Sequence, residues 1–144
     1  MPMIDVAQAL LAVAGLIFVT LGTLHGLLTL LDLGNPRAFT PTDASVRVAM
    51  QSARVAFNPR INLWQAWMGF NLSHSVGVVL AGGGLLFLAW PGFPAFVGSH
   101  LLQGIAAGVA AVYLVLSLRF WFWGPALGSG VALSCIVAAI VLAA

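Results

Sequence analysis

Histidine is the residue best suited to chemistry in this very apolar chain, and it occurs three times, at His25, His74 and His100. Near neutral pH an imidazole can hold a proton, bind a metal ion or hydrogen-bond a polar ligand. Two of the three have an amide side chain at helical spacing. Asn71 precedes His74 by three residues, and Gln103 follows His100 by three. Asn71, His74 and Ser75 therefore form one polar cluster, and His100 and Gln103 form a pair near the other end of their helix.

A further polar stripe begins at His25. Thr29 and Asp32 follow it at four and seven residues, so the three side chains share one face of a helix. Polar side chains within hydrocarbon usually face the protein interior and have partners there. We therefore expect this stripe to meet the stripe around Asn71 and His74.

Depth along the helices decides which side chains can meet. With a rise of 1.5 Å per residue, His25 lies about 9 Å and His74 about 3 Å from the middle of their predicted helices, toward the same side. His100 lies about 10 Å toward the other side. We predict one pocket with Thr29 and Asp32 at its mouth. The predicted ligand-binding residues are His25, Thr29, Asp32, Trp67, Asn71, His74, Ser75 and Tyr113.

Three uses of this pocket are compatible with the sequence. The first is structural, since hydrogen bonds between helices in lipid contribute about 0.6 kcal/mol each. The second is binding of a lipophilic small molecule, a quinone or a lipid, because polar groups that converge in an apolar cavity are typical of ligand sites. The third is ligation of a metal or a b-type haem by His25 and His74.

Catalysis has less support, because the chain has no Glu and no hydrolase or phosphate-loop motif. Asp32 is the one acid near the pocket. The sequence favours a non-catalytic accessory or ligand-binding subunit. The alternative is a membrane enzyme or redox carrier that uses His25 and His74.

The elements that position these residues follow from composition. The chain has 144 residues, 62% hydrophobic and 6% charged, whereas soluble domains are about 25% charged. About 20 apolar residues cross a bilayer as a helix. We predict an all-α integral membrane four-helix bundle in one domain, residues 1–144. The predicted helices span about residues 6–31, 61–90, 95–118 and 120–144, and the break after the second is at residues 90–94.

The segment 32–60 differs from the rest because it holds four of the five Arg residues. Residues 33–36, Leu-Gly-Asn-Pro, indicate a helix end, and residues 41–43, Pro-Thr-Asp, indicate a helix start. Apolar residues then recur at helical spacing: Val46, Met50, Ala53 and Phe57. We predict a short amphipathic helix over 43–57 that lies in the membrane surface. An ordinary solvated loop helix is the alternative.

The positions of the Arg residues predict the orientation. In a chain that crosses four times, the 32–60 loop and Arg119 lie on the same side. The positive-inside rule makes that side cytoplasmic. We expect a bacterial inner-membrane protein with both termini on the non-cytoplasmic side. Five scattered Arg residues form no basic face of the kind that binds nucleic acid.

Every predicted helix carries a pattern of small residues, mostly at four-residue spacing. They are Gly22 and Gly26 in the first helix, Gly69, Ser73, Gly77 and Gly82-Gly83-Gly84 in the second, Gly104 and Gly108 in the third, and Gly124, Gly128, Gly130, Ser134 and Ala138 in the fourth. Such residues let helix backbones approach closely in lipid. Packing within one bundle would use these faces, as would a homo-oligomer or a larger membrane complex. The single Cys135 lies in the last apolar segment and has no second Cys to pair with.

The segment Trp64-Gln65-Ala66-Trp67-Met68-Gly69-Phe70-Asn71-Leu72-Ser73-His74-Ser75, together with Leu24-His25, resembles a family of small bacterial four-helix membrane proteins. Its members carry a similar W-x-x-W-x-G-F-N-x-S-H segment. The resemblance would cover most of the chain. It implies that Asn71, Ser73 and His74 matter as a unit, and it implies no activity.

Overall fold

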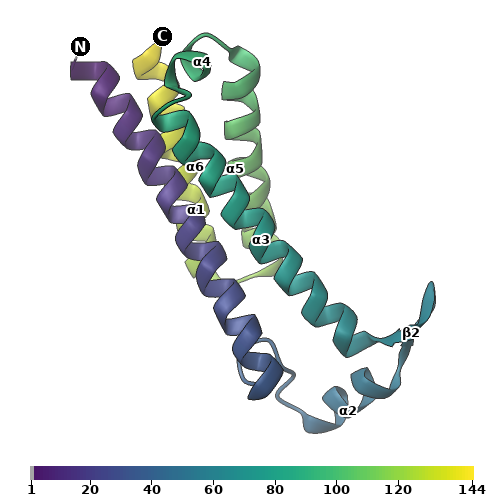
Figure 1. The fold of residues 1–144 in the computed structure, drawn as a ribbon. Coiled ribbons are helices and arrows are strands. Elements are labelled where there is room, and N and C mark those ends of the chain that lie inside the picture. The colour runs from purple at the N-terminus through teal and green to yellow at the C-terminus, as the bar shows by residue number, and fades with distance from the viewer. Residues whose placement is uncertain (1) are drawn as a thin grey trace. The chain divides into compact units, whose positions relative to one another are not determined.

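The chain folds almost entirely into helices (Figure 1). The structure, a computed structural model, describes residues 2–144, and it is 81% helical. In the described residues the helices are α1 (Pro2–Gly34), α2 (Ala44–Ser52), α3 (Leu63–Ala89), α4 (Phe93–Val97), α5 (His100–Phe120) and α6 (Trp123–Ala143), and the strands are β1 (Arg54–Val55) and β2 (Asn58–Asn62). Four of these helices, α1, α3, α5 and α6, are long and apolar enough to cross a membrane. The predicted helical class and the four long apolar helices are confirmed.

In the segment that joins α1 to α3, the predicted helix end and the predicted helix start are both where the structure has them. Helix α1 ends at Gly34, within the predicted stop. Asp43 is the N-cap of α2, and its Oδ1 accepts a hydrogen bond from the backbone N–H of Ser45 at 2.8 Å. This satisfies one of the backbone donors left unpaired at a helix start.

The prediction of a helix over residues 43–57 is wrong for its last five residues. Helix α2 ends at Ser52, and Ala53 is extended, with φ −67° and ψ 133°. The chain then forms an antiparallel hairpin of β1 and β2. Pro59 lies in β2, where its missing N–H excludes a helix interior. Phe57 is therefore in the hairpin turn and not on the apolar stripe of a helix.

The second half of the chain also departs from the predicted ranges. The residues after the predicted break form the short helix α4, and α5 begins at His100 and not near residue 95. Ser99 is the N-cap of α5, and its hydroxyl accepts from the N–H of Leu102 at 3.3 Å. Helix α5 then runs past Arg119, so that α6 begins at Trp123 and not at residue 120.

The contacts divide the chain into two compact units. One is Gly22–Gly77, which we call the polar unit. The other, the apolar unit, contains the residues up to Leu21 together with Val78–Ala144. Helices α1 and α3 each contribute residues to both units.

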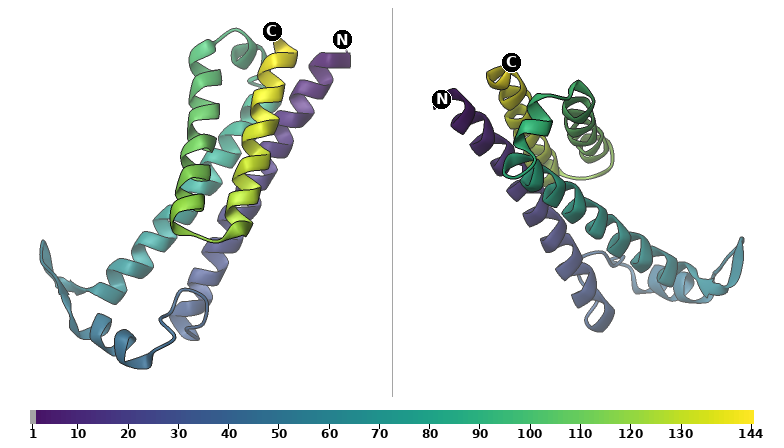
Figure 2. Two further views of the ribbon diagram at one scale, coloured as in Figure 1. Left: turned by 180° about the vertical axis from the view of Figure 1, so that it is seen from behind. Right: turned by 45° about the horizontal axis from the view of Figure 1, so that its top comes forward.

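The apolar unit has a core of small and medium side chains. Figure 2 shows its helices α5 and α6 running antiparallel side by side. The chain ends that Figure 1 marks lie close together, at the end of this unit where α4 also lies. Its buried hydrophobic residues are Ala7, Leu11, Ala14, Phe18, Val78, Leu85, Ala89, Phe93, Phe96, Ala106, Ala110, Ala132, Ile136 and Ala139.

The closest approach of α1 and α3 in the apolar unit is at Gly15 and Gly82. A Cβ on Gly82 would lie 2.6 Å from the backbone N of Val19 and 2.7 Å from the backbone O of Gly15. Only glycine permits backbones to meet at this separation. Gly82 is one of the predicted small residues, whereas Gly15 was not among them.

Several of the other predicted glycines differ in what surrounds them. Gly26 contacts Ser75 in the polar unit, and Gly128 contacts Leu21 in the apolar unit, so both serve packing within the chain. A second group has no atom of the described chain within 4 Å of a built Cβ: Gly69, Gly83, Gly84, Gly104 and Gly108. The pattern is therefore used for internal packing at some of its positions only.

Candidate functional site

The polar unit is unusual in that its buried side chains are mostly polar. Thr29, Asp32 and Asn71 are at most 1% exposed, and Ser75 is 6% exposed. Among the described residues, Met68 is the one buried hydrophobic residue that belongs to this unit. Burying polar groups without partners is unfavourable, so each must be hydrogen-bonded.

Asn71 of α3 is held at both ends of its amide. Its Nδ2 donates to the backbone O of Trp67 at 2.8 Å, and its Oδ1 lies 3.1 Å from Nε2 of His25 on α1. Because the amide oxygen can only accept, Nε2 of His25 is the protonated nitrogen. In the neutral imidazole Nδ1 is then the acceptor. Thr29 donates its hydroxyl hydrogen to the backbone O of His25 at 2.8 Å.

The rings around His25 form a compact aromatic group. The His74 ring lies 5.2 Å from the His25 ring between centroids, in an edge-on arrangement at 69°. The Phe39 ring lies 4.5 Å from that of His25. Along α3, His74 stacks on Phe70 at 6.2 Å, and Phe70 stacks on Trp67 at 6.5 Å. Two imidazoles thus lie side by side within an aromatic surface.

Asp32, predicted at the mouth of a pocket, holds the loop that follows α1. Its Oδ1 accepts from the N–H groups of Arg37 and Ala38 at 2.8 and 2.9 Å. Its Oδ2 accepts from the N–H of Phe39 at 2.6 Å and from the Thr40 hydroxyl at 3.1 Å. This clamp sets the position of Phe39 and so places an aromatic ring against His25.

Trp67 of α3 also holds this loop in place. Its Nε1–H donates to the backbone O of Phe39 at 2.8 Å. Sequence reasoning missed Phe39 because it lies between two prolines in an irregular loop, where no periodicity points to a site. Phe70 was also missed, although its position three residues after Trp67 and four before His74 is the spacing of one helix face.

Ser75 ties α3 to α1 directly. Its hydroxyl donates to the backbone O of Gly22 at 2.6 Å, and a Cβ on Gly26 would collide with the Ser75 Oγ. Gly26 and Ser75 are the residues next to His25 and His74. The two helices therefore touch where the imidazoles lie.

That contact decides whether a b-type haem fits between the histidines. Two axial imidazoles hold the iron between them, with the macrocycle in the plane that separates them. Helices that touch at Gly26 and Ser75 leave no such plane, and the imidazole centroids are 5.2 Å apart. A haem shared by His25 and His74 does not fit.

The polar unit offers a metal ion two neighbouring imidazoles, those of His25 and His74. Within residues 2–144, no three or more His, Cys, Asp or Glu side chains group so as to hold an ion. Zinc sites in proteins use three or four protein ligands. A pair of histidines is a weak basis for a dedicated metal site.

The structure brings seven of the eight predicted site residues into the polar unit: His25, Thr29, Asp32, Trp67, Asn71, His74 and Ser75. Tyr113 belongs to the apolar unit, where its ring lies 5.5 Å from that of Phe18. His100, which was left out of the predicted site, also lies there, and its Nδ1 is 3.2 Å from the Gln103 Oε1.

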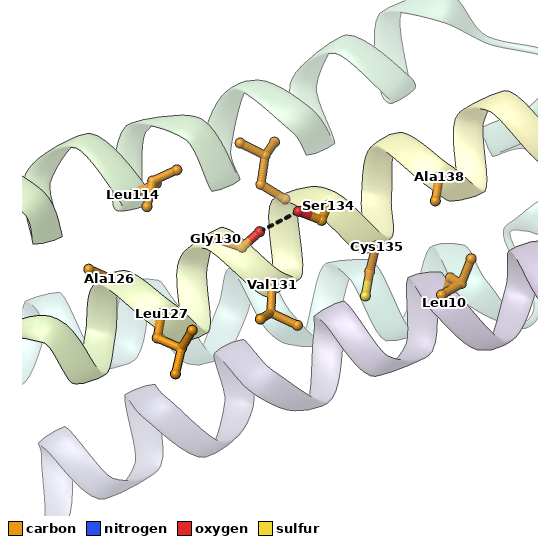
Figure 3. Close-up of a pocket in the computed structure, with 10 residues that line it drawn as sticks. Leu10, Leu114, Ala126, Leu127, Gly130, Val131, Ser134, Cys135 and Ala138 are labelled. Carbon is orange, nitrogen blue, oxygen red and sulfur yellow. Dashed lines mark hydrogen bonds between the residues drawn. The ribbon is translucent and has the colours of Figure 1, made fainter.

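The apolar unit has an open groove along α6 with a volume of about 630 Å³ (Figure 3). Leu10 of α1 and Leu114 of α5 border it, and Gly130, Ser134 and Ala138 lie in it at four-residue spacing. The Ser134 hydroxyl donates to the backbone O of Gly130 at 2.9 Å. The lining of this groove includes none of the predicted site residues.

Comparison of the chain with protein-family models, with curated proteins and with solved structures gives no match in any of the three.

Proposed function

We propose that this chain is a multi-pass membrane protein of the bacterial inner membrane and that α1, α3, α5 and α6 cross it. The length and hydropathy of these four helices support the proposal. With four crossings, the segment between α1 and α3 and the short link after α5 face the same side. Four Arg residues lie in that segment, and Arg119 lies in the last turn of α5 next to the link, so that side is cytoplasmic and both termini are outside.

Within that membrane protein, the polar unit binds a lipophilic small molecule with a flat, hydrogen-bonding head group of the quinone class. The observation that carries this proposal is the contact of the His25 and His74 rings, 5.2 Å apart, inside an aromatic group. A flat ring can stack on such side chains. A carbonyl oxygen of such a ring can accept a hydrogen bond from an imidazole N–H of His74, whereas the Nε2–H of His25 is donated to Asn71.

The positioning of the imidazoles supports a binding role. Asn71 orients His25, and the Asp32 clamp places Phe39 against the same ring. Sites that bind small ligands combine apolar walls with a few fixed polar groups. A half-buried pair of imidazoles with oriented neighbours fits that description.

A structural role is the second candidate, and it has its own support. The hydrogen bonds from Ser75 to Gly22 and between Asn71 and His25 both join α1 to α3. In this alternative the protein is an accessory subunit, alone, as a homo-oligomer or in a larger complex. The polar residues would then only hold the two helices together.

Native mass spectrometry of the detergent-purified protein separates the two candidates. We expect a bound mass in the quinone or lipid range that is lost in His25→Ala and in His74→Ala. His100→Ala is the matched control, because it removes an imidazole from the apolar unit, and it should keep the bound mass.

Three results would contradict ligand binding at this site. One is a chain without any bound mass, and another is a bound mass that both polar-unit variants retain. The third is a haem mass with its visible absorption. The first result, together with a loss of yield in His74→Ala, would favour the structural role, and the same spectra give the number of chains.

A further inference from the structure

The β1–β2 hairpin carries the most exposed large hydrophobic side chain of the described residues. Phe57 is 85% exposed and lies in the turn between the strands. It belongs to none of the four long apolar helices, so lipid contact along a spanning helix does not explain it. Figure 1 shows the hairpin projecting beyond the start of α3.

Each strand of the hairpin carries an arginine. Arg54 lies in β1 and Arg60 in β2, and both are exposed. Residues 44–62 contain a third Arg, Arg47 of α2, and no acidic residue. The nearest acids in the sequence are engaged by backbone N–H groups: Asp32 by the loop after α1, and Asp43 by Ser45.

The hairpin is joined to the start of α3 by the chain itself and by hydrogen bonds. Strand β2 runs into the helix without a linker, and the N–H of Leu63 donates to the backbone O of Ala53 at 2.9 Å. Asn62 and Gln65 form a reciprocal cap. The Asn62 N–H donates to Gln65 Oε1 at 2.9 Å, and the Gln65 N–H donates to Asn62 Oδ1 at 2.8 Å.

The hairpin therefore lies at the end of a helix that has two tryptophans near its start. Trp64 and Trp67 lie in the first two turns of α3. Tryptophan is enriched where spanning helices meet the headgroup region. The exposed phenyl ring and the arginines therefore lie at the level where headgroup phosphates would be found.

We infer that the β1–β2 hairpin docks on acidic phospholipid, with Phe57 inserted at headgroup depth and Arg54 and Arg60 on the lipid phosphates. The inference rests on the membrane insertion proposed above and is independent of the ligand in the polar unit. Guanidinium groups suit phosphate because they donate paired hydrogen bonds. Phenylalanine beside basic residues is the usual composition of segments that lie in the interface.

A fluorophore on the hairpin tests this docking in the full-length protein. Cys135→Ser removes the native thiol, and Ala56→Cys places a label next to Phe57. The protein is reconstituted in vesicles of phosphatidylcholine, with or without phosphatidylglycerol. Quenching by lipids with a headgroup nitroxide reports the depth of the label.

We expect strong quenching in the phosphatidylglycerol vesicles, and its loss in phosphatidylcholine alone or at high salt. Phe57→Ser and the double variant Arg54→Gln with Arg60→Gln should each reduce quenching to the level in phosphatidylcholine. Arg37→Gln is the control, since Arg37 is exposed but lies outside the hairpin, and it should leave the quenching unchanged.

The inference is overturned by quenching that is equal in both lipids, or by quenching that is absent from both. Carbonate extraction of the same vesicles separates two kinds of failure. A chain that is extracted contradicts membrane insertion and the docked hairpin with it. A chain that stays in the vesicles without quenching overturns the hairpin docking alone.

Discussion

The side chains of Asn71 and His25 are joined by a hydrogen bond whose direction is set one helical turn away. Because Nδ2 of Asn71 donates to the Trp67 carbonyl at 2.8 Å, the atom that faces Nε2 of His25, 3.1 Å away, is Oδ1. His100 shows the reverse arrangement. Gln103 donates its Nε2 hydrogens to the backbone O atoms of Phe96 and Val97, so its Oε1 faces Nδ1 of His100 at 3.2 Å.

These two amides predict opposite tautomers for two histidines of one chain. At alkaline pH, where imidazoles are neutral, His25 should carry its hydrogen on Nε2 and His100 on Nδ1. Nitrogen-15 NMR of histidine-labelled protein distinguishes the two forms. Asn71→Leu should convert His25 to a mixture and leave His100 unchanged. An Nδ1–H form of His25 in the unsubstituted protein would contradict the assignment.

Two serines on α3 differ in what they hold. Ser75 donates to Gly22 of another helix, whereas Ser73 donates to Phe70 of its own helix at 2.9 Å and is exposed. Ser75→Ala should lower the free energy of unfolding by about 0.6–1.7 kcal/mol, and Ser73→Ala should change it little. Unfolding by sodium dodecyl sulfate in mixed micelles measures both. If both variants lost the same free energy of unfolding, the hydrogen bond from Ser75 to the other helix would add no stability beyond that of a bond within one helix.

Adjacent glycines on α3 provide a second matched pair. A Cβ on Gly82 would press on backbone atoms of α1, whereas a Cβ on Gly83 has nothing within 4 Å. Gly82→Ala should therefore destabilise the fold by about 1–3 kcal/mol. Gly83→Ala should be neutral or more stable by up to about 1 kcal/mol, because alanine favours a helix. The same unfolding experiment decides between these outcomes, and a neutral Gly82→Ala would rule out the close backbone contact.

The Asp32 clamp should protect the loop after α1 from proteases. Asp32→Ala removes the acceptor of three backbone N–H groups and one hydroxyl, and charged hydrogen bonds contribute about 1.5–3 kcal/mol each. We expect chymotrypsin to cut after Phe39 many times faster in this variant. Cleavage after the exposed Phe57 is the internal reference, and Asp5→Ala is the control. Unchanged cleavage after Phe39 would contradict the clamp.

The cap of α2 should depend on pH. Hydrogen bonds from Ser45 lower the pKa of Asp43 below its ordinary value of 3.8. A carboxyl whose pKa is lowered by folding stabilises the fold above that ordinary value, and the contribution is lost as the pH falls through the lowered pKa. The amide resonance of Ser45 should titrate below 3.8 and should stop titrating in Asp43→Asn. A midpoint above 3.8 would contradict the cap.

The sequence allowed the long helices to be predicted because their signals are local. An apolar run, a Gly at its end and an Asp before the next helix need no distant partner, and Gly34 and Asp43 act as these signals predict. The hairpin was not predictable in this way. The spacing of Val46, Met50 and Phe57 fits a helix, and the pairing of β1 with β2 depends on contacts that periodicity does not report.

Part of the site was predictable, because the position of a residue along its helix predicts its depth, and residues at the same depth can meet. Depth placed His25 and His74 near each other, and their rings lie in contact. It did not reveal Phe39, because a loop residue has no depth in a helix, nor that Asp32 would be used to hold that loop. Use of the site for a ligand stays a prediction.

The polar unit is continuous in sequence, from Gly22 to Gly77, whereas the apolar unit joins the start of the chain to its last helix. During translation the clamp on the loop, the cap of α3 and the bonds between α1 and α3 can all be made before α5 is synthesised. The core around the first residues of α1 is complete only after α6 has been synthesised. We therefore expect the N-terminal part of α1 to become protected later than the polar unit as the chain grows.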